Sequence, residues 1–169
     1  MIEYSNRPIT PHTLVALMQD HPGVLNRVAS LFRQRGFNIE SLTVSRTDVP
    51  DISRMTIVVD GNTTNVEQVI KQLYKLIEVT KVTELTHEPH LSRELALIKV
   101  STSGNRRPEI LQLVEACHAA VADVGSDSVT VEVAGDRDRI DSVAAIMRPF
   151  GIKEIVRTGL IAMSRGAVN

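Results

Sequence analysis

The composition of the chain excludes several classes of protein. Its 169 residues carry 19 Lys and Arg against 20 Asp and Glu and include no Trp, so we expect no nucleic-acid partner. The single cysteine, Cys117, excludes an internal disulfide framework and fits a reducing compartment. No apolar run approaches the ~18 residues of a membrane span, so we expect a cytoplasmic protein without a membrane partner.

Strand and helix patterns alternate along the first half of the chain. The spacing of apolar residues predicts a strand, a helix, two strands, a helix and a strand, over residues 13–18, 22–35, 37–46, 54–60, 66–77 and 79–86. Gly36 stands where a left-handed cap would end the first helix. The parity of the apolar residues changes between Ile39 and Leu42, which predicts a bulge or burial on both faces. Residues 62–64, Asn-Thr-Thr, are expected to cap the second helix.

The second half of the chain repeats the same order of elements. Strands are expected over residues 95–101, 129–133 and 152–163, with a weaker one between 123 and 127. Pro108 opens the first helix of this half, and Asp136 caps the second. The buried stripes of these helices are expected to hold Ile110, Val114, Cys117 and Val121, and then Ile140, Val143, Ala144 and Met147.

Two successive βαββαβ units predict an α+β protein of two tandem ferredoxin-like sandwiches, each a sheet with both helices on one face. The polar stretch around Pro89 marks the boundary between them. We therefore expect a polar N-terminal tail over residues 1–10, a first domain over 11–86, a linker over 87–94 and a second domain over 95–169. The open edges of a four-stranded sheet favour pairing with a second copy, so a homodimer is expected.

The residues before the first helix predict an anion site. Pro22 has no N–H and its φ suits the first turn, so it is expected to start the helix. The amides of Gly23, Val24 and Leu25 then lack partners within the helix. They lie at the positively polarised end of the helix, which binds anions readily.

Asp20 adds a fixed negative charge to the same rim. A free α-amino acid fits this arrangement, because its carboxylate can accept from the helix amides while its ammonium meets Asp20 and the amide oxygen of Asn38. The alternative interpretation is purely structural. An acid before Pro-Gly is commonly a helix cap, and an asparagine such as Asn38, just after Gly36, is commonly a turn residue.

The motifs around this rim resemble a known family. A strand, D-x-P-G-V-L, a helix, R-G-F-N-I and a strand are similar to the ligand loop of ACT domains, which are small sensors of free amino acids attached to metabolic enzymes. More narrowly, RGFNIESLTVSRTDVPDISRMTIVV at residues 35–59 and TGLIAMSRG near the C-terminus resemble the regulatory (small) subunits of acetolactate synthase, also called acetohydroxyacid synthase. The resemblance covers residues 11–166, and the first domain is thereby expected to be an ACT domain.

The resemblance implies a non-catalytic chain that binds the large, thiamine-diphosphate-dependent subunit of acetolactate synthase. In the family, the small subunit activates the large one and confers feedback inhibition by valine, in some members also by leucine or isoleucine. Thiamine diphosphate, magnesium and FAD are expected in the large subunit and no cofactor in this chain. The family holds valine between ACT domains of two chains, which here matches Asp20, His21, Pro22, Gly23, Val24 and Leu25 of one chain with Asn38 and Ile39 of its neighbour. Some relatives carry Asn in place of Asp20, which leaves the choice of effector open.

Two other functions stand beside this one. The first is a stand-alone tandem ACT-type sensor that acts on a transcription factor or a transporter. The second is a metal-sensing regulator, suggested by His87 with His90 and by Cys117 with His118. The first pair brackets a proline and Cys117 lies on an apolar stripe, so no metal is expected. Residues 101–111 lack the acid-x-Pro-Gly rim, so the second domain is expected to serve association and partner contact, and no catalytic motif is present.

Overall fold

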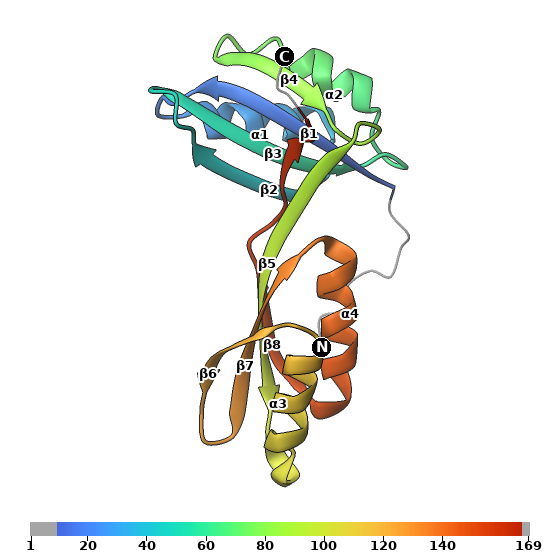
Figure 1. Ribbon diagram of the computed structural model, residues 1–169. Coiled ribbons are helices and arrows are strands. Elements are labelled where there is room, and N and C mark those ends of the chain that lie inside the picture. Colours follow the sequence, from blue (N-terminus) through green and yellow to red (C-terminus); the bar gives the residue numbers. More distant parts are fainter. Residues whose placement is uncertain (1–9, 167–169) are drawn as a thin grey trace. The chain divides into compact units, whose positions relative to one another are not determined.

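The computed structural model describes residues 10–166 of the chain (Figure 1). It divides into two compact units, one comprising the residues up to Leu91 together with those from Ala162 onward, and the other Ser92–Ile161. The expected polar tail, residues 1–10, lies outside the described residues except for its last position. Within residues 10–166, no helix is long and apolar enough to cross a membrane.

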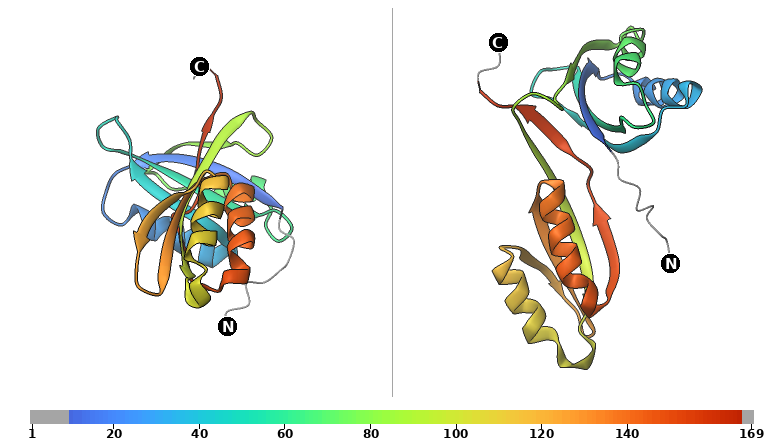
Figure 2. Two further views of the ribbon diagram at one scale, coloured as in Figure 1. Left: turned by 60° about the horizontal axis from the view of Figure 1, so that its bottom comes forward. Right: turned by 90° about the vertical axis from the view of Figure 1, so that its right-hand side faces the viewer.

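The first unit has the predicted βαββαβ order. Its elements are β1 (Pro11–Gln19), α1 (Val24–Arg35), β2 (Ile39–Arg46), β3 (Ile52–Asp60), α2 (Val66–Leu73) and β4 (Val79–Glu84). The strands form an antiparallel sheet in the order β2-β3-β1-β4, and α1 and α2 cover one face of it (Figure 2). The ferredoxin-like sandwich expected for this half of the chain is therefore confirmed.

The core of the first unit follows from two periodicities. Every second residue of a strand faces the helices, and every third or fourth residue of a helix faces the sheet. The buried cluster holds Leu14, Ala16, Met18, Val24, Val28, Phe32, Met55, Ile57, Val59, Val69, Leu73 and Val79. Phe32 is its largest side chain and packs edge to face against Phe37, with ring centroids 5.8 Å apart.

The end of α1 confirms the predicted glycine cap. Gly36 has a left-handed φ of 67°, its amide donates to Arg33 O, and the amide of Phe37 donates to Phe32 O. These two bonds make a Schellman motif. The predicted bulge is also present, because the pairing of β2 with β3 shifts register between Ile39 and Ser41.

The second helix of this unit is shorter than expected. Its N-cap is Asn65, whose side chain accepts from the amide of Gln68, rather than residues 62–64. The helix ends at Leu73 because the following residues form turns, in which Leu76 N donates to Leu73 O and Val79 N to Leu76 O. The prediction that Ile77 lies on the buried stripe was wrong, since its side chain is 89% exposed.

The second unit repeats the topology of the first. Its elements are β5 (His90–Ser101), the 3-10 turn η1 (Ser103–Asn105), α3 (Arg107–Ala116), β6 (Ala120–Val124), β7 (Ser128–Gly135), α4 (Arg137–Met147), the 3-10 turn η2 (Arg148–Phe150) and β8 (Ile152–Arg157). The sheet order is β6-β7-β5-β8, equivalent strand for strand to the first. Asp136 caps α4 through the amide of Arg139, as predicted. All four residues assigned to the inner stripe of α4 are buried.

Two expectations for the second unit were wrong. Helix α3 stops at Ala116, and His118 takes a left-handed φ of 51° that a helix cannot continue. Val121 therefore lies in β6, 41% exposed, rather than on the helix stripe. The weak strand expected between residues 123 and 127 is present as β6, which begins and ends three residues earlier than expected.

The boundaries of the units also differ from the expected domains. Strand β5 begins at His90, so most of the expected linker over residues 87–94 is strand. The expected extended end divides into β8 and β9 (Ile161–Ser164). Ala162 packs with Val15 and Leu85, and its carbonyl accepts from Arg54 Nη2 at 2.5 Å. The last residues thus group with the first unit rather than with the second domain.

Candidate functional site

The turn between β1 and α1 differs from the predicted helix start. The amide of Val24 donates to His21 O at 3.3 Å, and Gly23 has φ 87° and ψ −7°. A proline at the second position and a left-handed glycine at the third are the signature of a type II β-turn. The helix therefore begins at Val24 and not at Pro22, because a residue in the conformation of Gly23 cannot belong to a right-handed helix.

This turn leaves main-chain donors open at the start of α1. The amide of Val24 is occupied, but those of Gly23 and Leu25 donate to no acceptor within residues 10–166. The amide of Asn26 also donates to no acceptor in this part of the chain, and the sequence had not identified it as a donor. A Cβ placed on Gly23 would meet nothing within 4 Å, so this backbone is accessible. Two of the three predicted donors are thus present, and a third lies one residue further along.

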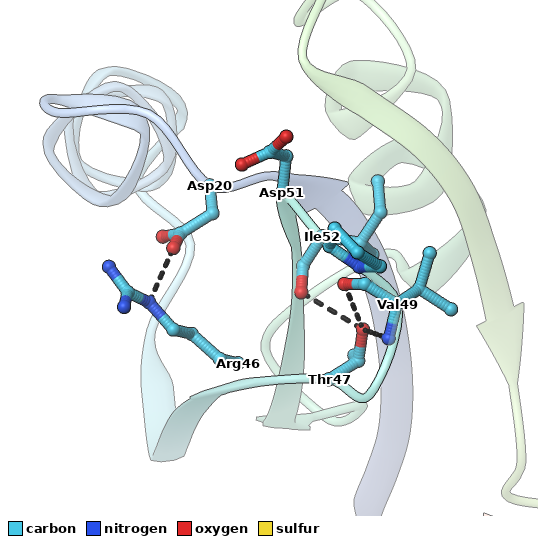
Figure 3. Close-up of a pocket in the computed structure, with 7 residues that line it drawn as sticks. Asp20, Arg46, Thr47, Val49, Asp51 and Ile52 are labelled. Carbon is cyan, nitrogen blue, oxygen red and sulfur yellow. Dashed lines mark hydrogen bonds and ion pairs between the residues drawn. The ribbon is translucent and has the colours of Figure 1, made fainter.

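Asp20 does not cap the helix. Its Oδ2 lies 2.6 Å from Arg46 Nε (Figure 3). Its Oδ1 accepts from Ser53 Oγ at 3.2 Å. Its amide donates to Asp51 O at 2.8 Å. Helix α1 has no side-chain cap at all, so the structural alternative considered for Asp20 is wrong. The acid is instead held by the β2–β3 hairpin.

The β2–β3 hairpin forms one side of a small open pocket. The pocket has a volume of about 310 Å³ and is lined by Asp20, Arg46, Thr47, Val49, Pro50, Asp51 and Ile52 (Figure 3). Only Asp20 belongs to the residues selected from the sequence. The strand order could have revealed the others, because β3 pairs with β1 so that Gln19 faces Ile52. This pairing brings the hairpin turn beside the end of β1.

Asn38 and Ile39 lie at the other end of α1. The twelve residues of this helix span about 18 Å, at about 1.5 Å per residue. One chain therefore does not bring Asn38 beside the turn at Gly23. The side chain of Asn38 is exposed, its Nδ2 donates to Glu40 Oε1 at 2.5 Å, and its oxygen accepts no hydrogen bond within residues 10–166. It adjoins β2, an edge strand that a second copy can approach.

Comparison with protein families matches both halves of the chain. Residues 14–81 match the AHAS small subunit-like ACT domain, and residues 93–166 match the small subunit of acetolactate synthase.

Similar proteins are found among curated sequences and solved structures. The chain is 54% identical over 155 residues to a probable acetolactate synthase small subunit of Archaeoglobus fulgidus, covering 92% of this chain and 97% of the relative. It is 50% identical to an acetolactate synthase small subunit of Mycobacterium leprae, covering 92% of each chain. The crystal structure of the acetolactate synthase small subunit from Thermotoga maritima has a TM-score of 0.84 and 40% identity, covering 95% of this chain and all of that one.

Proposed function

The chain belongs to the family of acetolactate synthase small subunits, and we propose that it regulates the catalytic subunit of that enzyme. In this proposal it binds the catalytic subunit, raises its turnover and makes it sensitive to inhibition by free valine. Catalysis, thiamine diphosphate, magnesium and FAD belong to the catalytic subunit, and this chain contributes none of them.

The observation that supports effector binding is the open turn before α1. Unpaired amides at Gly23, Leu25 and Asn26 can donate to a carboxylate, and the helix end favours its negative charge. Asp20 lies on the same segment, and its carboxylate already holds a cation, the guanidinium group of Arg46. An α-amino acid carries a carboxylate and an ammonium group about one carbon apart. It therefore complements both the amide donors and the Asp20 carboxylate, whereas a simple anion complements only the amides.

The ion pair between Asp20 and Arg46 does not prevent this binding. The Arg46 side chain is 85% exposed, and exposed pairs of this kind contribute only about 0–1 kcal/mol. The ammonium group of an effector can therefore replace the guanidinium at low cost. Arg46 is then free to turn toward solvent or toward the carboxylate of the effector.

A complete effector site requires two chains in this proposal. Asp20 to Leu25 of one chain supply the carboxylate donors and the acid, while Asn38 and Ile39 of the partner subunit supply an amide oxygen and an apolar wall. The separation of these two segments by the whole length of α1 supports a shared site. Two copies related by a twofold axis would then form two equivalent sites.

The size of the effector sets how selective the site can be. Valine has two carbons more than alanine, and at about 0.8 kcal/mol per buried CH2 this favours valine by roughly tenfold. Leucine has one further methylene, which is worth only about 1–3 kcal/mol in a fitted pocket. Inhibition by leucine or isoleucine at higher concentration is therefore expected.

Reconstitution with a catalytic subunit tests the proposal. The turnover of a thiamine-diphosphate-dependent acetolactate synthase large subunit is measured alone and with this chain, each with and without valine. We expect the mixture to turn over faster than the large subunit alone and to be inhibited by valine, while the large subunit alone is insensitive. If this chain changes neither the turnover nor the response to valine, the proposal is wrong and a stand-alone sensor becomes the better interpretation.

A further inference from the structure

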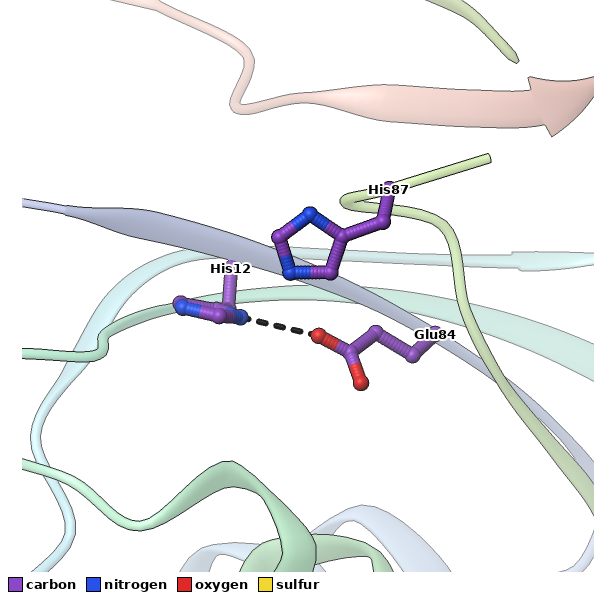
Figure 4. Close-up of side chains that lie close together, drawn as sticks. All are labelled: His12, Glu84 and His87. Carbon is purple, nitrogen blue, oxygen red and sulfur yellow. Dashed lines mark hydrogen bonds and ion pairs between the residues drawn. The ribbon is translucent and has the colours of Figure 1, made fainter. Parts of the chain in front are cut away.

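Three side chains with potential metal-ligand atoms lie close together at one end of the first sheet, and the proposed function assigns them no role. His12 lies on β1, Glu84 ends β4, and His87 follows in the next turn. Nδ1 of His12 lies 2.8 Å from Glu84 Oε1, and one potential ligand atom from each of the three residues lies within 4.8 Å of the others. Figure 4 shows the His87 ring beside this pair, with a ring nitrogen directed toward it.

We propose that His12, Glu84 and His87 bind a divalent transition-metal ion of the zinc type. Zinc binds imidazole nitrogen and carboxylate oxygen at about 2.0–2.2 Å, which places neighbouring ligands of a tetrahedral site about 3.3 Å apart. The three ligand atoms lie within 4.8 Å of one another, so they need to move closer together to share one ion. Small side-chain rotations bring them onto one ion, and a water completes the coordination.

The backbone that carries these ligands is fixed. Leu85 N donates to Thr13 O at 2.8 Å, and Thr13 N donates to Thr86 Oγ1 at 3.0 Å. Leu85 is 1% exposed, and its carbonyl accepts from Glu88 N to close the turn that holds His87. Each ligand therefore projects from a rigid segment, as a metal site requires.

Gly61 determines which nitrogen of His12 is available. A Cβ on Gly61 would lie 2.6 Å from His12 Nε2, so this edge of the ring lies against the glycine backbone. Nδ1 is the nitrogen that faces Glu84. A metal ion would replace the hydrogen bond between His12 and Glu84, and the imidazole that binds the ion must be neutral.

The donor set selects the kind of ion. Two imidazoles and one carboxylate suit zinc, cobalt or nickel, whereas magnesium and calcium prefer oxygen ligands throughout. The side chains of His12 and Glu84 are 18% and 30% exposed, so the site is shielded but reachable. The sequence had led us to consider His87 with His90 and to expect no metal; in the structure His90 Nδ1 lies 2.8 Å from Glu88 O, outside this group.

The alternative is a purely structural cluster. The rings of His12 and His87 pack edge to face, with centroids 5.7 Å apart and an angle of 81° between their planes. Such packing together with the bond to Glu84 needs no metal. Zinc binding by the whole chain separates the two interpretations.

The test is a calorimetric titration of the full chain with zinc chloride after treatment with a chelator. We expect one zinc per chain, a midpoint temperature of unfolding that rises with zinc concentration, and no response to magnesium. Glu84→Gln and His87→Ala should each weaken zinc binding by at least about tenfold. His87 is exposed, so its variant is expected to fold normally, which circular dichroism verifies.

Two control variants exclude other zinc ligands. His90→Ala removes the neighbouring histidine, and Cys117→Ser removes the only thiol; both should bind zinc as the unmodified chain does. The proposal is overturned if zinc does not bind, if Glu84→Gln and His87→Ala bind it unchanged, or if Cys117→Ser abolishes binding. Activation of the catalytic subunit and binding of valine are independent of these outcomes.

Discussion

The two units share one strand order but surround the start of their first helix differently. In the first unit, α1 begins after an open type II turn with Asp20 beside it. In the second, two arginines occupy the start of α3. Arg106 donates to Pro149 O at 3.1 Å and lies over the Phe150 ring, and Arg107 donates to Gly125 O at 2.6 Å.

In our proposal, this difference places effector binding in the loop before α1 and not in the fold that the two units share. Both helix ends carry the positive polarity that attracts anions. In our proposal, Asp20 before α1 holds the ammonium group of the same ligand, and no residue of the α3 start is assigned that role. At the start of α3, Arg106 and Arg107 donate to carbonyl groups of their own unit. That the second unit binds no amino acid remains a prediction.

The far ends of the same two helices resemble each other closely. In α1 the left-handed position is Gly36, and in α3 it is His118, with φ 67° and 51°. The amide of the residue after the left-handed one donates back to a carbonyl of the last helical turn, from Phe37 to Phe32 and from Ala119 to Val114. The equivalent of Asn38 in the second unit is therefore Ala120.

The largest expected effect is that of Gly23→Asp. The new carboxylate would face the carboxylate of valine, and such like-charge contacts cost several kcal/mol, so we expect at least roughly a 100-fold loss of valine affinity. Gly104→Asp is the matched control, because Gly104 also has a positive φ, 72°, and open space around it. It carries the same backbone strain in the second unit.

Calorimetric titration with valine measures both variants. Gly104→Asp should bind valine normally, and both variants should still activate the catalytic subunit. Unchanged valine binding by Gly23→Asp, or an equal loss in the two variants, would contradict the assignment of the site to the first unit.

A smaller effect is expected for Asn38→Ala. Hydrogen bonds to charged groups contribute about 1.5–3 kcal/mol, so losing the contact with the ammonium should weaken valine binding by roughly tenfold or more. Activation of the catalytic subunit should persist. Ala120→Asn places an asparagine at the equivalent position of the second unit and should leave valine binding unaltered. If Asn38→Ala binds valine as tightly as the unmodified chain, Asn38 does not contribute to the site.

The smallest effect concerns stability alone. A left-handed residue other than glycine costs roughly 1–2 kcal/mol, so His118→Gly should raise the free energy of unfolding by about 1 kcal/mol. The reverse experiment is Gly36→Ala, which should lower it by a similar amount. Denaturation by urea measures both. A loss of stability in His118→Gly would mean that the exposed imidazole makes a contact that outweighs its backbone strain.

Local patterns predicted much of the fold correctly. The glycine cap at Gly36, the bulge after Ile39 and the N-cap at Asp136 depend on neighbouring residues only. The order of strands and helices followed from the spacing of apolar residues. The errors arose where a single backbone conformation ends a pattern. Left-handed His118 stopped α3 before Val121, and left-handed Gly23 delayed α1 beyond Pro22.

The candidate site was predicted in part. Asp20 and the amides of Gly23 and Leu25 were identified from the sequence, because proline, glycine and an acid act within one turn. Arg46 and Ser53 were not identified, since they lie far along the chain and reach Asp20 only through the pairing of β1 with β3. The suggestion that Asp20 caps the helix was wrong, because these two distant residues hold its carboxylate and α1 has no side-chain cap.

The sequence alone determined the two βαββαβ units, the caps at Gly36 and Asp136 and the segment with unpaired donors, because each depends on apolar spacing or on the local conformational preferences of a few neighbouring residues. Only the tertiary structure decided which distant side chains meet. It placed Arg46 on Asp20, His12 beside Glu84 and His87, and Ala162 against the first unit. The physical reason is that strand pairing sets these contacts, and pairing joins residues whose separation along the chain carries no local signal.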